Sequence, residues 1–183
     1  MELKSALEQL GLLQKKLYAY QTASSSLYLD SVTVAPKDTS EGRGVALGIL
    51  AGESQKLMTA PETGELLAFL ADQKENLSFV EQRQVEELKR SYDRLSRIPA
   101  DEYMDYAMLT NEASDVWHRA KESSDFTLFA PVLEKLVAYN RKFAGYYDSS
   151  KKPYDALLDE YERGADMAFL DTFFETVRER LVP

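Results

Sequence analysis

Apolar residues recur every three or four positions along most of the chain, a spacing that places them on one face of a helix. The first stripe consists of Leu3, Leu7, Leu10, Leu13, Leu17 and Tyr20. The small residues at 23–26 could be a linker, but we favour a stretch where a second helix approaches closely. The segment Asp30–Pro36 contains several β-branched residues and ends in proline, which predicts an extended connection.

Three residue pairs have the spacing of a capping box, in which two side chains satisfy backbone N–H groups at a helix start. The pairs are Asp38 with Glu41, Thr59 with Glu62, and Ser78 with Glu81. They predict helices over about 40–58, 61–74 and 79–96.

Proline, aspartate and glycine residues mark the boundaries of the remaining predicted helices. Four helix starts are marked, by Pro99, by Asp125 with Pro131, by Pro153 and by Asp166. Gly164 is the expected C-cap of a short helix over 154–161. The last helix has an apolar face formed by Phe169, Leu170, Phe173, Phe174, Val177 and Leu181. Eight helical segments and no convincing strand predict an all-α fold, a multi-helix bundle of about seven to eight helices with no sheet.

Length and composition limit the classes of protein that this chain can represent. Its 183 residues predict a single helical domain over 1–183 with a real core. The net charge of −9 argues against nucleic acid as a partner, because phosphates require a basic surface. The absence of cysteine excludes disulfides and Cys-ligated zinc, and fits a cytoplasmic location. We also expect no membrane partner, because no apolar run approaches the roughly 18 residues of a membrane span.

The sequence offers few groups for catalysis or metal binding. A zinc peptidase needs two histidines one helical turn apart and a general base, and His118 is the only histidine. We interpret His118 as structural, and no serine nucleophile or phosphate-binding glycine loop is recognisable. No catalytic, cofactor-binding or metal-binding residue is therefore assigned to this chain.

Two further features allow a role beyond structure. Asp155, Asp159 and Glu162 line one helix face and could bind a hard cation, although we favour a solvated surface. Trp117, the only tryptophan, could anchor a partner or substrate, although we favour a place in the core.

Four blocks of residues follow one another in a specific order. They are Leu27, Asp30, Thr33, Pro36 and Arg43; Trp117, Arg119 and Ala120; Asp125, Phe126, Phe129, Pro131 and Leu133; and Tyr154, Asp155, Ala156, Leu157, Leu158, Asp159, Tyr161 and Glu162. In this order they resemble the carboxypeptidase Taq family of HExxH metallocarboxypeptidases, from about residue 27 to the chain end. Leu29, Ala35, Lys121 and Arg163 stand where the family usually has Trp, Met, Arg and Pro.

The resemblance implies the amino-terminal portion of a longer helical peptidase. In that family the HExxH helix, the third zinc ligand and the contacts to the substrate carboxylate lie downstream of the matched region. The parent would release C-terminal residues from peptide substrates, with zinc or another divalent metal polarising the carbonyl and activating water. We therefore expect these 183 residues alone to lack the zinc site and to be inactive.

Truncation would expose apolar surfaces, and we expect these to self-associate, with the last helix involved around Phe173, Phe174 and Val177. Two alternatives remain open at this point. One is a free-standing helical protein-interaction module, and the other is the amino-terminal part of an oligoendopeptidase-type zinc peptidase.

Overall fold

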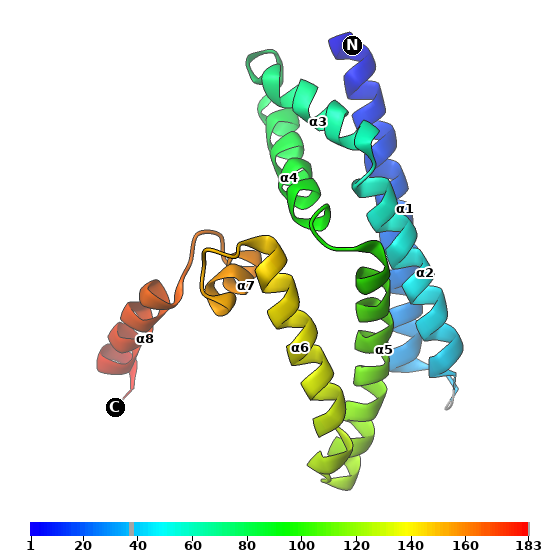
Figure 1. The fold of residues 1–183 in the computed structure, drawn as a ribbon, viewed down its shortest axis with the longest axis vertical. Coiled ribbons are helices and arrows are strands. Elements are labelled where there is room, and N and C mark those ends of the chain that lie inside the picture. Colours follow the sequence, from blue (N-terminus) through cyan, green and yellow to red (C-terminus); the bar gives the residue numbers. More distant parts are fainter. Residues whose placement is uncertain (37–38, 183) are drawn as a thin grey trace. The chain divides into compact units, whose positions relative to one another are not determined.

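The structure of the protein is a computed structural model that describes residues 1–36 and 39–182. Within these residues it contains α-helices and short 3-10 helices but no strand, which confirms the predicted all-α fold (Figure 1). The helices are α1 (Leu3–Thr33), α2 (Ser40–Met58), α3 (Pro61–Asp72), η1 (Lys74–Asn76), α4 (Phe79–Leu95), α5 (Ala100–Ser123), η2 (Phe126–Leu128), α6 (Ala130–Tyr147), α7 (Pro153–Tyr161) and α8 (Met167–Leu181). None of the helices within the described ranges is long and apolar enough to cross a membrane.

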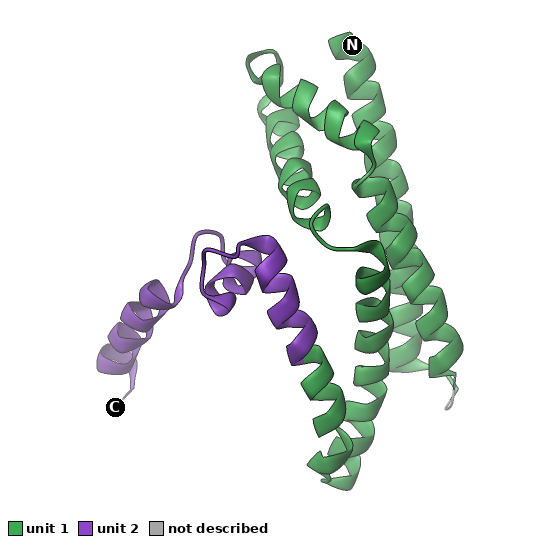
Figure 2. Cartoon of the chain, in the orientation of Figure 1, with its two compact units in different colours: residues 1–136 green, residues 137–183 purple. Residues whose placement is uncertain are grey.

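The chain forms two compact units, Met1–Leu136 and Val137–Pro183, with the boundary inside α6 (Figure 2). The first unit contains α1 to α5 and the start of α6. The second contains the rest of α6 together with α7 and α8. The expectation of a single domain stays a prediction.

The core of the first unit lies where α3 packs between α1 and α4. Its buried side chains are Ala6, Leu10, Leu13, Leu66, Leu67, Leu70, Leu77 and Val85. Leu3, Leu7 and Leu17 pack partly buried against this cluster. Five of the six residues in the first predicted stripe therefore face one core, as the helical spacing predicts.

A second packing region joins α2 to α5, and glycines on α2 determine how closely the two helices approach. A Cβ atom on Gly48 would lie 2.6 Å from Cγ of Met108, and one on Gly44 would lie 3.1 Å from Nδ2 of Asn111. Real Cβ atoms essentially never approach another heavy atom as closely as the first of these distances. Gly48 is therefore a packing requirement of the α2–α5 contact.

The predicted extended segment Asp30–Pro36 is wrong, because α1 continues to Thr33. The Thr33 hydroxyl donates to the Leu29 carbonyl oxygen at 2.6 Å, so this β-branched residue satisfies its polar group within the helix. The helix stops before Pro36, as proline disfavours a helical conformation in the residue that precedes it. Residues 23–26 are also helical and are not a linker.

The three predicted capping boxes have different outcomes. The box of Ser78 and Glu81 is confirmed: the Ser78 N–H donates to Glu81 Oε2 at 2.7 Å, and the Glu81 N–H donates to Ser78 Oγ at 3.3 Å. The box of Thr59 and Glu62 is wrong, because the N-cap of α3 is Ala60 and the Thr59 hydroxyl donates back to Gln55 of α2. Asp38 lies outside the described residues.

Replacing Ser78 with alanine is expected to raise the pKa of Glu81 and to destabilise α4. The Ser78 hydroxyl, and then the Ser78 backbone N–H, hold the pKa of Glu81 below its usual value of 4.5. A lowered folded-state pKa stabilises the fold above the unfolded pKa, and this stabilisation is lost as the pH falls through the folded-state pKa. Loss of a serine N-cap typically costs about 1 kcal/mol.

The pKa of Glu81 can be followed by NMR titration of its side-chain carboxyl resonance, and stability by urea unfolding. Ser91→Ala is a suitable control, because Ser91 lies on the same helix and its hydroxyl bonds only to the Glu87 carbonyl among the contacts described. An unchanged Glu81 titration in Ser78→Ala would show that the box does not set this pKa.

Candidate functional site

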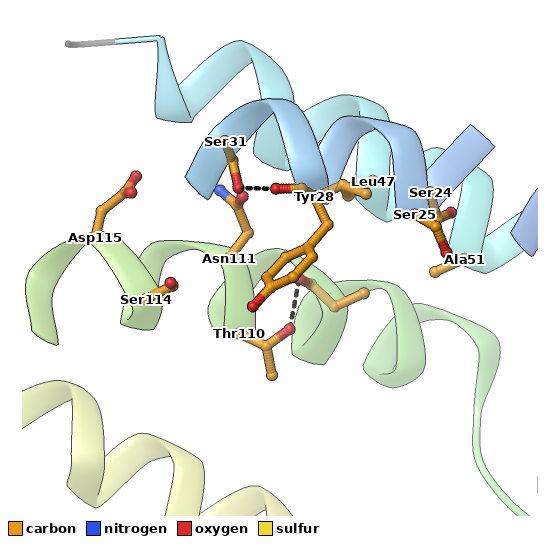
Figure 3. Close-up of a pocket in the computed structure, with 11 residues that line it drawn as sticks. Ser24, Ser25, Tyr28, Ser31, Leu47, Ala51, Thr110, Asn111, Ser114 and Asp115 are labelled. Carbon is orange, nitrogen blue, oxygen red and sulfur yellow. Dashed lines mark hydrogen bonds between the residues drawn. The ribbon is translucent and has the colours of Figure 1, made fainter. Parts of the chain in front are cut away.

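Helices α1, α2 and α5 surround a pocket of about 420 Å³ in the first unit (Figure 3). Its lining is Ser24, Ser25, Tyr28 and Ser31 of α1, Leu47 and Ala51 of α2, and Ala107, Thr110, Asn111, Ser114 and Asp115 of α5. On α1, the pocket residues 24, 28 and 31 are four and three positions apart, so one helix face presents them together. The unbroken course of α1 through residue 31 is what creates this wall.

Six of the eleven residues that line the pocket carry a hydroxyl group, and two of these hydroxyls already have partners within their own helices. The Ser31 hydroxyl donates to the Tyr28 carbonyl oxygen at 2.6 Å, and the Thr110 hydroxyl donates to the Ala107 carbonyl oxygen at 2.8 Å. The exposed Tyr28 ring extends from α1 toward α5 in Figure 3. The pocket therefore offers hydroxyl groups beside an apolar wall contributed by α2.

Arg43 of α2 fixes one end of this pocket through α5. Its Nη2 lies 3.5 Å from Asp115 Oδ2, and its Nε donates to Asn111 Oδ1 at 3.3 Å. Asn111 in turn donates from Nδ2 to the Ser40 carbonyl oxygen at 3.1 Å. The hydrogen bonds of this network join the start of α2 to α5. Because the mostly buried guanidinium of Arg43 balances the Asp115 charge, the pocket has no strong net charge.

The lining of this pocket offers no recognisable catalytic group. The lining has no histidine, cysteine or lysine that could activate one of its hydroxyls as a nucleophile. Across residues 1–36 and 39–182, no group of three or more His, Cys, Asp or Glu side chains is placed to hold a metal ion. The donor set of a zinc site does not fit the described residues, and we derive no catalytic step through a metal here.

His118 and Trp117 lie together on α5. Their rings make an edge contact with centroids 4.9 Å apart. Trp117 is 43% exposed, so our expectation of a core position was wrong. The buried stripe of α5 consists of Leu109, Ala113, Val116 and Ala120, and Trp117 lies at its edge.

Trp117 instead lines a second pocket, of about 360 Å³, with Ala120, Lys121, Ser124, Phe126 and Phe129. Lys121 Nζ lies 4.9 Å from the centre of the indole ring, within the range of a cation–π contact. The pocket begins at α5 and continues over η2. Nothing in its lining resembles a catalytic pair.

Of the three carboxylates at Asp155, Asp159 and Glu162, two have a structural use that the solvated-face interpretation did not include. Asp155 Oδ1 accepts the Met167 N–H at 2.9 Å, and Asp159 Oδ1 accepts the Gly164 N–H at 3.0 Å. Gly164 has φ of 74°, which favours glycine. Two of the three acids therefore hold the turn that joins α7 to α8. Helix α7 ends at Tyr161, and Glu162 follows it as the C-cap, the position that was predicted for Gly164.

The block that begins at Asp125 also forms local structure. Asp125 Oδ1 accepts the Thr127 N–H at 2.9 Å and so caps η2, and Pro131 lies in the first turn of α6. Asp166 similarly caps α8 by accepting the Phe169 N–H at 2.8 Å. The predicted starts at Asp125 and Asp166 are confirmed.

The pocket between α1, α2 and α5 was missed from the sequence. Eight of its lining residues carry a hydroxyl, amide or carboxylate on helix faces that sequence reasoning had not paired. The available signal was the helical spacing of Ser24, Tyr28 and Ser31, which the assumption of an extended segment at Asp30–Pro36 interrupted.

Comparison with known proteins gives consistent matches. The carboxypeptidase Taq (M32) metallopeptidase family matches residues 9–183. Carboxypeptidase 1 of Bacillus subtilis (strain 168) is 36% identical over 171 residues, which is 93% of this chain and 34% of that protein. Thermostable carboxypeptidase 1 of Pyrococcus furiosus is 32% identical over 169 residues, 92% of this chain and 34% of that protein.

Solved structures agree with these sequence matches. The crystal structure of BsuCP matches with a TM-score of 0.91 and 35% identity, covering 97% of this chain and 36% of that chain. Metallocarboxypeptidase 1 of Trypanosoma cruzi matches with a TM-score of 0.77 and 29% identity, covering 97% and 36%. The chain spans about a third of the length of the curated relatives it matches. From its sequence and its fold alike, the chain belongs to the carboxypeptidase Taq (M32) family of metallopeptidases.

Proposed function

We propose that the chain is the amino-terminal helical region of a carboxypeptidase Taq-type metallocarboxypeptidase. The whole protein would release C-terminal residues from peptides by metal-assisted hydrolysis, with zinc as the expected metal and the cytoplasm as the expected location. The 183 residues would serve as scaffold and would be inactive alone.

The observation that carries this proposal is the near-complete match to one third of longer relatives. A TM-score of 0.91 over 97% of the chain means that almost every helix has a counterpart in a solved relative, most of whose length lies outside the match. The inactivity of the chain alone is supported by its single histidine and by the donor groups of the described residues, which do not fit a zinc site.

The test compares three purified proteins with a short peptide substrate and added zinc. They are the 183-residue chain, the part of B. subtilis Carboxypeptidase 1 that lies outside the match, and a chimera in which this chain replaces the matching third of that protein. We expect C-terminal residues to be released by the chimera alone. We also expect less than one zinc ion per molecule of the 183-residue chain after dialysis, measured by elemental analysis.

Release of C-terminal residues by the 183-residue chain, or stoichiometric zinc retained by it, would contradict the proposed division of roles. A folded chimera without peptidase activity would contradict the proposal that this chain can serve as the scaffold of such an enzyme.

A further inference from the structure

Helix α8 carries an apolar face none of whose residues is buried. This α8 face consists of Phe169, Leu170, Phe173, Phe174, Val177 and Leu181. No residue of α8 is buried, and Phe173 and Phe174 are 51% and 58% exposed. Their rings make an edge contact with each other at 5.3 Å between centroids, on the same exposed surface.

The ends of α8 are well formed, so the exposed face is not explained by a poorly specified helix. Asp166 caps its start, and Asp155 accepts the Met167 N–H. Arg178 and Arg180 in the last turn complement the negative end of the helix dipole. However, an isolated helix of 15 residues is only marginally stable in water, because most helix stability in proteins comes from burying an apolar face.

The second unit cannot supply that burial from its own core. Its buried apolar residues are Phe143, Ala144, Ala156 and Ala165, and none of them belongs to α8. Three of the four are alanines, which offer little apolar area. A cover for the α8 face must therefore come from outside the second unit.

We propose that the α8 face is a docking surface for the portion of a carboxypeptidase Taq peptidase that these 183 residues do not span. This inference rests on the proposed function. The match to BsuCP includes 97% of this chain but only 36% of that relative, so a longer chain of this fold has ample structure available to cover α8.

A second copy of this chain is a weaker candidate for the occupant. A stable protein interface involves roughly 20–30 residues from each partner, and the α8 face has far fewer. Self-association through Phe173, Phe174 and Val177 remains a prediction from the sequence, and the experiment below distinguishes it from docking of the longer protein.

The test uses thiol labelling at position 173, because the chain has no natural cysteine. Phe173→Cys is made in the 183-residue chain and in the chimera with B. subtilis Carboxypeptidase 1, and the labelled site is identified by peptide mass mapping. We expect labelling of residue 173 to be at least about tenfold slower in the folded chimera, because reaction then requires local opening. Thr172→Cys, an exposed position on the opposite side of α8, is the matched control and should change much less.

A second measurement uses the 183-residue chain alone. Phe173→Glu combined with Phe174→Glu should leave its unfolding transition unchanged, as should the control pair Ala168→Glu and Thr172→Glu. A large loss of stability specific to the phenylalanine pair would mean that the chain itself covers the α8 face, and would overturn the proposal.

The other possible outcomes also decide whether the α8 face is this docking surface. Equal labelling of residue 173 in both proteins, or failure of the chimera to fold, would overturn the docking surface. Protection that rises with the concentration of the 183-residue chain to the level of the chimera would assign the face to a second copy. If the chimera hydrolyses peptides while residue 173 is still labelled rapidly, this inference alone is overturned. If residue 173 is protected in the chimera but the chimera does not hydrolyse peptides, the proposed function alone is overturned.

Discussion

Replacing Leu70 with alanine is expected to lower the free energy of unfolding of the chain by about 3–5 kcal/mol. The Leu70 side chain is 0% exposed and lies in the cluster where α3 meets α1 and α4. The other buried side chains of that cluster come from α1, α3 and α4 and from Leu77, so they cannot collapse freely into the space that the substitution leaves. Both the lost burial and the residual cavity therefore contribute to the cost.

The measurement is urea unfolding followed by far-ultraviolet circular dichroism. The dependence of the unfolding free energy on urea concentration, the m-value, should be the same in both proteins. Leu12→Ala on α1 is the matched control, because Leu12 is 54% exposed and should cost less than about 1 kcal/mol. If the two leucines cost the same, the assignment of this cluster as the core is wrong.

Replacing Gly48 with leucine is expected to be the second most damaging change, with a loss of about 2–3 kcal/mol. Helix propensity alone favours the substitution, because leucine is a far better helix former than glycine. The opposite result is expected because even a Cβ atom at this position would meet Met108 at 2.6 Å and Met104 at 3.4 Å. Packing against α5 therefore outweighs propensity.

Gly42→Leu on the same helix is the control, because a Cβ atom on Gly42 has nothing within 4 Å. We expect this variant to be as stable as the unchanged chain or slightly more so, by thermal unfolding. A Gly48→Leu chain that melts no lower than Gly42→Leu would mean that the methionines of α5 move aside without cost.

Much of the helical architecture follows from local sequence signals. The leucine spacing from Leu3 predicts a core-facing helix, and Ser78 with Glu81 predicts the start of α4, because both signals act within one or two helical turns. The errors arose where a local signal had two possible uses. Thr33 is β-branched, which favours an extended chain, but its hydroxyl is satisfied inside the helix. Thr59 has the spacing of a cap for α3 but serves the end of α2.

The pocket could not be predicted because it depends on the packing of three helices. Tyr28 and Asp115 are separated by most of the first unit, and only the α2–α5 contact and the course of α1 bring their helices around one space. The acids of α7 illustrate a different limit. Their spacing in the sequence placed them on one helix face. Their hydrogen bonds depend on how the chain turns after α7, where Asp159 accepts the Gly164 N–H and Asp155 accepts the Met167 N–H.

The length of α1 has a mechanical consequence. Its 31 residues make a rod of roughly 45 Å at 1.5 Å per residue. Near one end, Ala6 and Leu10 are clamped among the leucines of α3, while Tyr28 near the other end stands beside the hydroxyl-lined space. Because an unbroken helix resists bending, a tilt of α1 at Tyr28 would also displace Ala6 and Leu10 near its other end.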